Sequence, residues 1–360
     1  MNSNWTRWLP AAVVPALVAG IALVVPLQAS ATTELPAKTA QQVLAMVAGS
    51  QVQAFSGTVE QSAELGLPQL PAVGQPQDSP IASVLELLTG SHTARVYVDG
   101  PTKSRVQVMD KLAERDVIRN GSDLWLYSSD DNSTVHATLP PQDAAHSPQI
   151  PGQTAPTPAT LSQKVLSGLD ASTRVTVEKD TAVAGRTAYN LVLTPRTDGT
   201  LVRSVAIAVD SETGLPLRVQ VLARGQQNPA FQLEFSALSL AAPSADRFTF
   251  TPPPGSSVKE QKMPAWKDLA TKQEKPAQSS KALHEPPQVI GTGWSAIVEI
   301  PAAAVPKELT DSPLLLQVTT AVADGRLLHT SLLNVLFTND GRVFAGSVPA
   351  AQLQAAAQRQ

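Results

Sequence analysis

The sequence predicts an α+β fold whose main domain is one antiparallel sheet with helices packed on one face. Three observations support this prediction. Short strand-like runs follow one another across turn residues with no helix between them, which is typical of antiparallel pairing. Aliphatic stripes at helical spacing predict a few short amphipathic helices. A segment rich in Lys, Gln, Glu, Ser and Pro then precedes a smaller C-terminal unit, which we expect to be a separate α+β module.

The first 31 residues have the layout of a secretory signal. Arg7 supplies a positive charge, the stretch Leu9–Leu27 carries none, and Ala29–Ala31 places small residues where a signal peptidase reads them. We expect the mature chain to begin near Thr32 and to work outside the cytoplasmic membrane, either secreted or associated with the cell envelope. The alternative is an uncleaved anchor, because the apolar stretch almost reaches the ~20 residues that span a bilayer. Three prolines within the stretch favour cleavage.

The composition argues against several classes of protein. The chain has 360 residues and no cysteine, so it has neither disulfides nor a lipobox cysteine that could carry a lipid anchor. A chain of this length can bury a core without disulfides. The formal net charge is −3, which predicts no nucleic-acid partner.

Three stretches predict helices. Residues 37–49 carry aliphatic side chains at helical spacing, and Gly49 is a natural end for that helix. The second stripe is the most regular, at positions i, i+3, i+4 and i+7, and consists of Ile81, Val84, Leu85 and Leu88. Residues 161–169 predict the third helix after a proline-rich loop.

Strand-like runs occupy most of the remaining main domain. Turn pairs such as Asn120-Gly121 and Thr213-Gly214 separate them. The runs are residues 55–64, 95–99, 104–109, 115–118, 124–127, 135–139, 174–178, 187–194, 201–210, 215–223, 230–238 and 248–251.

These patterns divide the chain into four parts. We expect a signal peptide at 1–31, the main domain at 32–258, a flexible linker at 259–288 and the small module at 289–360. Within the module, residues 294–300, 331–337 and 343–348 are strand-like, 314–321 is mostly apolar, and 350–358 predicts a short helix.

The sequence contains little that indicates catalysis. Its five histidines lie far apart, and none has a second ligand at metal-binding spacing. Nucleophile-elbow, S-x-x-K and phosphate-loop patterns are missing from the sequence. We therefore expect a protein that is not an enzyme and has no catalytic residues, metal site or cofactor.

The strand faces suggest instead an apolar surface that the helices cover. Bulky residues alternate with small or polar ones, as where Phe231, Leu233 and Phe235 flank Gln232 and Glu234. A covering of short helices either packs to full density or leaves a cavity that accepts a lipid chain. Periodicity alone leaves both alternatives open.

Several phrases resemble the superfamily of the lipoprotein carrier LolA, the regulator RseB and mycobacterial lipid carriers. They are residues 55–59 (FSGTV), 116–127, 183–193, 209–218 and 248–255. The resemblance spans about residues 39–258 and implies an open antiparallel half-barrel with helices plugging its concave side. In that superfamily the concave side binds acyl chains or a hydrophobic protein segment. This sequence departs from the lipoprotein members because it lacks the lipobox cysteine.

Our first hypothesis is a carrier that holds a lipid or an acylated lipoprotein in an apolar cavity. The expected lipid-binding residues are Ile81, Val84, Leu85, Leu88, Val205, Ile207, Val209, Leu217, Val219, Phe231, Leu233 and Phe235. Trp125 and Tyr127 are either rim or core residues. The alternative is an RseB-like regulatory module that binds a membrane protein partner and senses the state of the envelope. A third hypothesis is a fully packed structural domain with no ligand.

Overall fold

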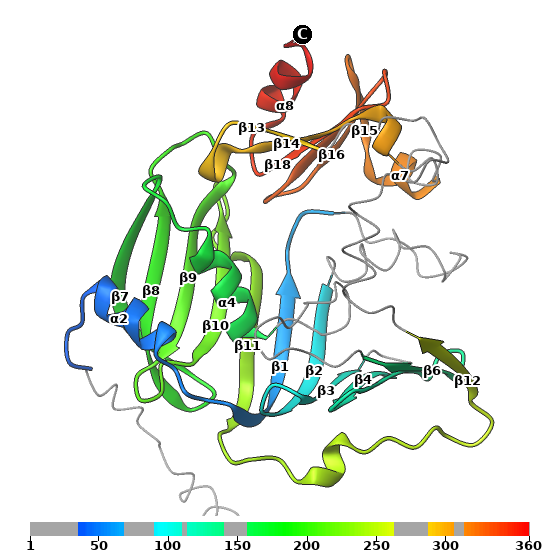
Figure 1. Cartoon of the computed structure of the whole chain (residues 1–360). Helices are drawn as coiled ribbons and strands as arrows, with labels where there is room; N and C mark the ends of the chain where they lie inside the picture. Colours follow the sequence, from blue (N-terminus) through cyan, green and yellow to red (C-terminus); the bar gives the residue numbers. More distant parts are fainter. Residues whose placement is uncertain are drawn as a thin grey trace, which may run out of the picture. The chain divides into compact units, whose positions relative to one another are not determined.

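The computed structural model describes residues 35–67, 90–109, 114–139, 157–262, 287–305 and 313–359. Within these residues the main sheet contains twelve strands. The strands are β1 (Ala54–Ala63), β2 (Gly90–Asp99), β3 (Lys103–Met109), β4 (Glu114–Asn120), β5 (Asp123–Ser128), β6 (Ser133–Thr138), β7 (Thr173–Val183), β8 (Arg186–Pro195), β9 (Val202–Asp210), β10 (Pro216–Ala223), β11 (Pro229–Ser239) and β12 (Ser257–Lys262). Their order is β12-β6-β5-β4-β3-β2-β1-β11-β10-β9-β8-β7 (Figure 1). The sheet is open, because β12 and β7 form its two ends. This confirms the large open antiparallel sheet that the sequence predicts.

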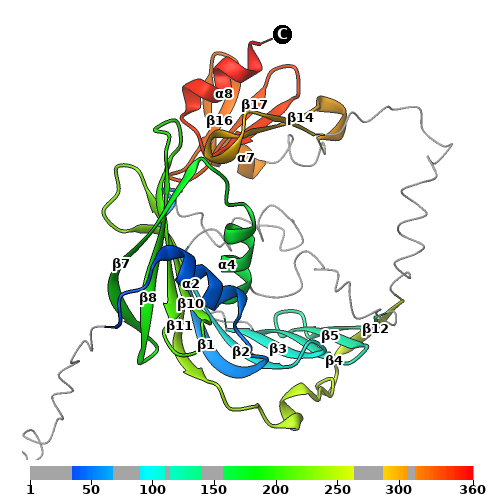
Figure 2. The same cartoon turned by 60° about the vertical axis from the view of Figure 1, so that its left-hand side comes forward.

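Two helices pack against this sheet, and their caps follow from the sequence. Helix α2 (Ala40–Ala48) begins after Thr39, whose hydroxyl accepts from the backbone N–H of Gln42 in a capping box, and Gly49 ends it. Helix α4 (Pro158–Ser167) begins after Thr157 in the same way and ends at Gly168. Both lie on the same side of the sheet in Figure 2. They confirm two of the three predicted helices; the third, Ile81–Leu88, lies outside the described residues.

Strand β9 is buried on both faces, which differs from the alternation that the sequence suggests. Every residue from Val205 to Asp210 is buried, and successive side chains of a strand point to opposite faces. The small Ala206 and Ala208 are therefore buried as well, and Ala208 packs in an apolar cluster with Ala188 and Leu217. Arg218, which pairs with Ala208, bonds Glu234 at 3.9 Å and the Thr181 hydroxyl at 3.2 Å.

A β-bulge changes the face of one predicted site residue. The pairing of β10 with β9 shifts between Pro216 and Arg218, so Leu217 is the extra residue. Leu217 packs in the apolar cluster that contains Ala208, whereas Val219 packs in the cluster that contains Ile207, and these two residues point to opposite faces of β9. Period-two alternation would have placed Leu217 and Val219 together, and the bulge separates them.

The chain returns to the far edge of the sheet after β11 and adds an unexpected strand there. Residues 240–256, which we call the strap, include the 3₁₀ helix η1 (Ala245–Phe248) and lead to β12, which pairs with β6 in parallel (Figure 1). The predicted strand at 248–251 is wrong. Phe248 ends a helical turn with its side chain 2% exposed, and Pro252–Pro254 lack the N–H groups that a ladder needs.

One described strand runs across the predicted domain boundary at Val258. The boundary falls inside β12, which extends to Lys262 and so includes residues 259–262 of the predicted linker. The residues from 263 to 286 lie outside the described part of the chain. The side chains at 257–261 are exposed and all but Val258 are polar, which explains why the composition resembles a linker.

The C-terminal residues form a second sheet of six strands. Its order is β13-β14-β18-β17-β16-β15, built from β13 (Gln288–Ile290), β14 (Ile297–Ile300), β15 (Thr320–Val322), β16 (Gly325–His329), β17 (Asn334–Thr338) and β18 (Val343–Gly346). The short helical segments are η2 (Gly293–Ser295), η3 (Ala302–Ala304), α7 (Pro313–Val318) and α8 (Ala350–Ala357). Helix α8 packs on Ile297, Leu336 and Phe344 through Leu353. The sequence missed β16 and read α7 and β15 as a single apolar run.

The expected signal peptide lies outside the described residues. Within the described part of the chain, none of the helices combines the length and apolar character needed to cross a membrane.

Candidate functional site

An apolar pocket of about 710 Å³ lies between α2, α4 and the first strands of the sheet. Helix α2 contributes Leu44, Val47 and Ala48, and the residues after it add Ser50 and Val52. The sheet contributes Phe55, Val96, Val98, Ser104, Val106, Leu215 and Pro216. Helix α4 and its cap contribute Thr157, Ala159, Thr160, Gln163, Leu166 and Leu169. This volume is within the ~300–1,000 Å³ typical of small-molecule sites.

Strand register explains why the floor of the pocket is apolar. Phe55 of β1 pairs with Val98 of β2, and Val96 of β2 pairs with Val106 of β3. Directly paired residues of neighbouring strands point to the same face, so these side chains form adjacent rows. Phe55 is further fixed by an edge-to-face contact with the ring of Phe235 at 5.8 Å.

The turn between β9 and β10 holds α2 as one wall of the pocket. Gly214 has φ +72° and lies against the backbone of α2, so that a Cβ there would stand 2.2 Å from the Met46 carbonyl oxygen. Only glycine combines this backbone conformation with such a close approach. The two residues that follow, Leu215 and Pro216, line the pocket.

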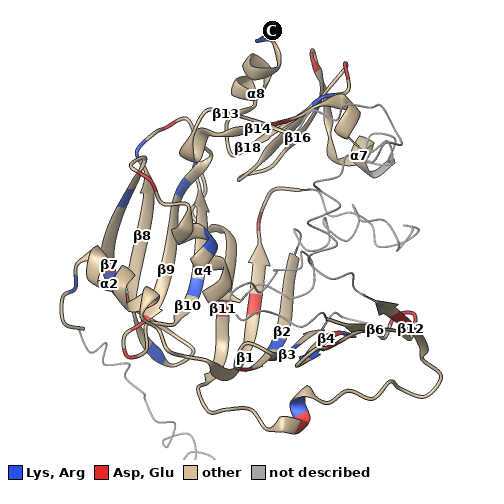
Figure 3. Cartoon of the chain, viewed as in Figure 1, with Lys and Arg blue, Asp and Glu red and all other residues tan. Residues whose placement is uncertain are grey.

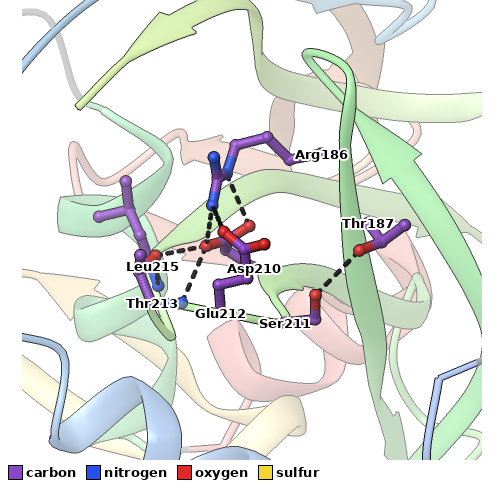
Figure 4. Close-up of polar contacts among 7 residues, drawn as sticks. All are labelled: Arg186, Thr187, Asp210, Ser211, Glu212, Thr213 and Leu215. Carbon is purple, nitrogen blue, oxygen red and sulfur yellow. Dashed lines mark hydrogen bonds and ion pairs between the residues drawn. The ribbon is translucent and has the colours of Figure 1, made fainter. Parts of the chain in front are cut away.

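A buried carboxylate fixes the same turn (Figure 4). Asp210 is 1% exposed and accepts from Arg186 Nε at 2.8 Å and Nη2 at 3.0 Å. It also accepts from the backbone N–H of Thr213 at 2.9 Å and from the Thr213 hydroxyl. Burial raises the pKa of Asp210, but the hydrogen bonds from Arg186 and Thr213 outweigh it and hold the pKa below the usual value.

Helix α4 forms the opposite wall and is only loosely buried. Its apolar residues Leu161, Val165, Leu166 and Leu169 are half-buried, whereas Ser162 is fully buried. The Ser162 hydroxyl has no hydrogen-bond partner among the described residues. Ser50 Oγ, which lines the pocket, likewise lacks a partner within the described chain. A polar atom of a ligand could satisfy the Ser50 hydroxyl, because it faces the pocket.

We expect Ser162→Ala to raise the free energy of unfolding by about 1 kcal/mol, because it removes a buried polar group without a partner and adds a better helix former. Urea denaturation of the variant and the wild type measures the difference. Ser167→Ala is the control: Ser167 is exposed, its hydroxyl bonds the Lys164 carbonyl, and its effect is expected to stay near zero. A loss of stability in Ser162→Ala would show that its hydroxyl has a stabilising partner.

The pocket carries no charge among its lining residues, and α2 carries none at all. Figure 3 shows Lys, Arg, Asp and Glu elsewhere on the strands and turns around it. Such a site can bind an apolar group and place a few hydroxyl or amide groups at its rim. It offers no arrangement for proton transfer or nucleophilic attack in the residues that line it.

The predicted lipid-binding residues that the structure describes pack beside the pocket but do not line it. Leu217, Leu233 and Phe235, with Phe231 packed against them, belong to one apolar cluster. Val205, Ile207, Val209 and Val219 belong to the cluster beneath α2 and α4. None of these eight lines the described pocket, and Ile81, Val84, Leu85 and Leu88 lie outside the described residues. Their role in ligand binding therefore stays a prediction.

Sequence reasoning missed the residues that do line the pocket. Leu44 and Val47 were predicted to be helical, and Val96 and Val106 to lie on strands, but nothing ranked them above other apolar residues. The usable signal is weak: the 95–99 and 104–109 hairpin alternates, which identifies one apolar face. Which side chains of that face line the pocket depends on where α2 and α4 lie.

Trp125 and Tyr127 are not rim residues of this pocket. Leu126 pairs with Val117, which pairs with the pocket residue Val106, so the residues on either side of Leu126 point to the opposite face. There the ring of Trp125 lies 5.5 Å and the ring of Tyr127 lies 5.8 Å from the ring of Phe250 in the strap.

Residues 86–265, half of the chain, match the family model described as the MucB/RseB N-terminal domain. The chain belongs to the MucB/RseB family. The matched residues include β12. The match also confirms the resemblance to the LolA/RseB superfamily that the sequence phrases indicate.

Solved structures similar to this MucB/RseB-family chain include MucB in the Pseudomonas aeruginosa MucA/MucB complex. The identity is 16%, the match covers 88% of this chain and 96% of that one, and the TM-score is 0.41. A crystal structure of MucB shows 15% identity, coverage of 88% and 94%, and a TM-score of 0.39. A LolA superfamily protein from Nitrosomonas europaea shows 14% identity, coverage of 59% and 99%, and a TM-score of 0.24. No curated protein matches the chain. The family assignment rests on the family model.

Proposed function

We propose that this chain is a regulatory binding protein of the extracytoplasmic compartment, which grips an apolar segment of a membrane protein partner in the α2–α4 pocket. The observation that carries the proposal is an uncharged, half-open apolar pocket in a chain of the MucB/RseB family. The signal-like first 31 residues support export. The proposed function needs no catalytic residue, metal or cofactor.

The wall formed by α4 suits the binding of such a segment. Leu166 and Leu169 line the pocket yet stay half-buried, so an incoming apolar side chain can complete their burial. Burying apolar surface contributes roughly 25 cal/mol per Å², and the hydroxyls at the rim can bond a backbone. MucB itself is solved in complex with MucA. For this chain we propose a protein partner as well.

Lipid binding is the second candidate function, and the mostly apolar, uncharged lining of the pocket favours it. Methylene groups are buried without any charged partner, at about 0.8 kcal/mol each. In this alternative the helices move to admit an acyl chain, and the eight described members of the predicted set lie beneath or beside the ligand. Because the eight described members are core residues or lie against the core, a charged substitution at Ile207 or Leu233 would test folding before it tests lipid binding.

Leu166→Glu tests the site without opening the core. We expect it to lower recovery of the bound partner by about tenfold or more, because a carboxylate would be desolvated inside the apolar pocket. Full-length chain is used to capture proteins from detergent-solubilised membranes of its own organism, and the captured proteins are quantified by mass spectrometry. Ser167→Glu is the matched control, since it adds the same charge to the same helical turn outside the pocket.

The outcomes separate the two candidates. One membrane protein recovered near equal stoichiometry with wild type and Ser167→Glu, but lost with Leu166→Glu, supports the regulatory function. Native mass spectrometry before and after organic extraction tests the lipid alternative: a discrete extractable mass that Leu166→Glu loses would support a carrier. If both variants match the wild type in both assays, the pocket is not the binding site.

A further inference from the structure

His136 of β6 lies between two carboxylates from the strands on either side of it. Its Nε2 is 3.1 Å from Asp123 Oδ1 of β5, and its Nδ1 is 2.9 Å from Glu260 Oε2 of β12. A neutral imidazole has one N–H and one lone pair, so one ring nitrogen would face a carboxylate oxygen without a proton. Both contacts are hydrogen bonds only when the ring carries two protons and a positive charge.

The aromatic surroundings of His136 also favour the charged ring. The Trp125 ring stacks on it with centroids 3.9 Å apart and planes 16° apart, and the indole face is the best aromatic surface for a cation. Phe250 of the strap packs against the same Trp125 at 5.5 Å. The imidazole is 17% exposed, so water screens these contacts only in part.

Asp123 and Glu260 are the charged groups that contact His136 from the two adjacent strands. On β6 itself the neighbours on that face are Thr134 and Thr138. Within the described residues, no group of three or more His, Asp or Glu side chains is arranged to hold a metal ion.

Strand β12 depends on this cluster because little else attaches it. It pairs with β6 in parallel, which is the less stable mode of pairing, and its side chains are exposed, with Val258 at 47%. Beside the backbone ladder, side-chain contacts come from the Thr134 and Ser256 hydroxyls at 2.6 Å and from His136 with Glu260.

We propose that His136, Asp123 and Glu260 form a proton-dependent latch that holds β12 on β6 and so closes this edge of the sheet. When the imidazolium loses a proton, one of its two hydrogen bonds becomes an unfavourable contact, and β12 loosens. Attachment of β12 is therefore stronger in mildly acidic than in alkaline solution. Release of β12 leaves the backbone groups of β6 unpaired.

Hydrogen exchange of the full chain between pH 4 and pH 8.5, corrected for intrinsic exchange rates, measures the latch directly. We expect the amides of residues 258–262 to be about threefold to tenfold better protected at pH 5.5 than at pH 8.5, while β9 amides serve as an internal reference. His136→Phe keeps a ring on Trp125 but removes both hydrogen bonds, and should give low protection at both pH values. Glu260→Gln, at a side chain that is 70% exposed, should lower the ratio without affecting the fold.

His329→Gln is the control, because His329 lies in the other sheet, where it contacts Asn334 Oδ1 at 2.7 Å. It should leave the pH dependence of β12 unchanged. The proposal is overturned if β12 protection in the wild type does not vary with pH. It is equally overturned if the wild-type variation persists in both His136→Phe and Glu260→Gln.

Discussion

Replacing Gly214 by alanine is expected to lower the free energy of unfolding by about 3 kcal/mol. A left-handed backbone conformation costs an L-residue roughly 1–2 kcal/mol, and overpacking adds about as much again. Here the new Cβ would stand 2.2 Å from the Met46 carbonyl oxygen, and that atom belongs to the helix backbone, which cannot rotate away. The turn or α2 must shift, so the pocket wall should move with the loss of stability.

Gly225→Ala is the matched control for this prediction. Gly225 has φ +80° in the turn between β10 and β11, and a Cβ there would meet nothing within 4 Å. Gly225→Ala should lower the free energy of unfolding only by the conformational cost of the left-handed backbone, about 1 kcal/mol. Urea denaturation measures both variants, and partner capture measures the pocket. Equal losses of unfolding free energy in the two variants would show that the contact between the turn and α2 does not affect stability.

Asp210→Ala is expected to cost about 3 kcal/mol, because it removes the buried acceptor of the Arg186 guanidinium and of the Thr213 N–H and leaves Arg186 only the exposed Glu212. Breaking one side of a buried pair costs more than the pair itself contributes, since the remaining charge stays partly desolvated. Asp210 also fixes the turn that carries Gly214, Leu215 and Pro216. We therefore expect lower stability and weaker partner capture together, measured by urea denaturation and by the capture assay.

The contribution of the Asp210 charge should also depend on pH. The folded-state pKa of Asp210 lies below that of the unfolded chain, which is about 3.9. The stabilisation is fully present above the unfolded-state pKa and is lost as the pH falls through the folded-state pKa. The difference in unfolding free energy between the wild type and Asp210→Asn should thus be larger at pH 6 than at pH 2.5.

Glu212→Gln provides the comparison for Asp210. Glu212 also contacts Arg186, at 2.7 Å, but its side chain is 76% exposed. An exposed pair contributes only about 0.2–1 kcal/mol. A loss in Glu212→Gln as large as that in Asp210→Ala would mean that the exposed partner, not the buried one, holds Arg186.

Much of the main sheet could be predicted because its signals are local. Turn pairs such as Asn120-Gly121 and Asp99-Gly100 mark hairpins, and Gly49 marks the end of α2. Each depends on a few neighbouring residues. The edge strand β12 gave no such signal, since it is polar, exposed and paired with a strand more than a hundred residues away.

The candidate site was less accessible from the sequence for the same reason. Ile207 and Leu233 look like ligand-binding residues because they are bulky members of alternating strands, yet neither lines the pocket. Leu44, Val96 and Leu166 are equally ordinary in the sequence and do line it. Which apolar side chains border the pocket depends on where α2 and α4 lie, and that depends on distant contacts such as Gly214 against Met46.

The sequence by itself determined the α+β class, the antiparallel order of most hairpins, the two described helices and the superfamily resemblance. These follow from periodicity, turn chemistry and caps, which act over a few residues. The tertiary structure alone decided which apolar residues stay open, which face Leu217 takes at its bulge, and that His136 meets Glu260 across 124 residues. Such outcomes depend on how distant segments pack together, because burial and pairing are set by the partner rather than by the residue.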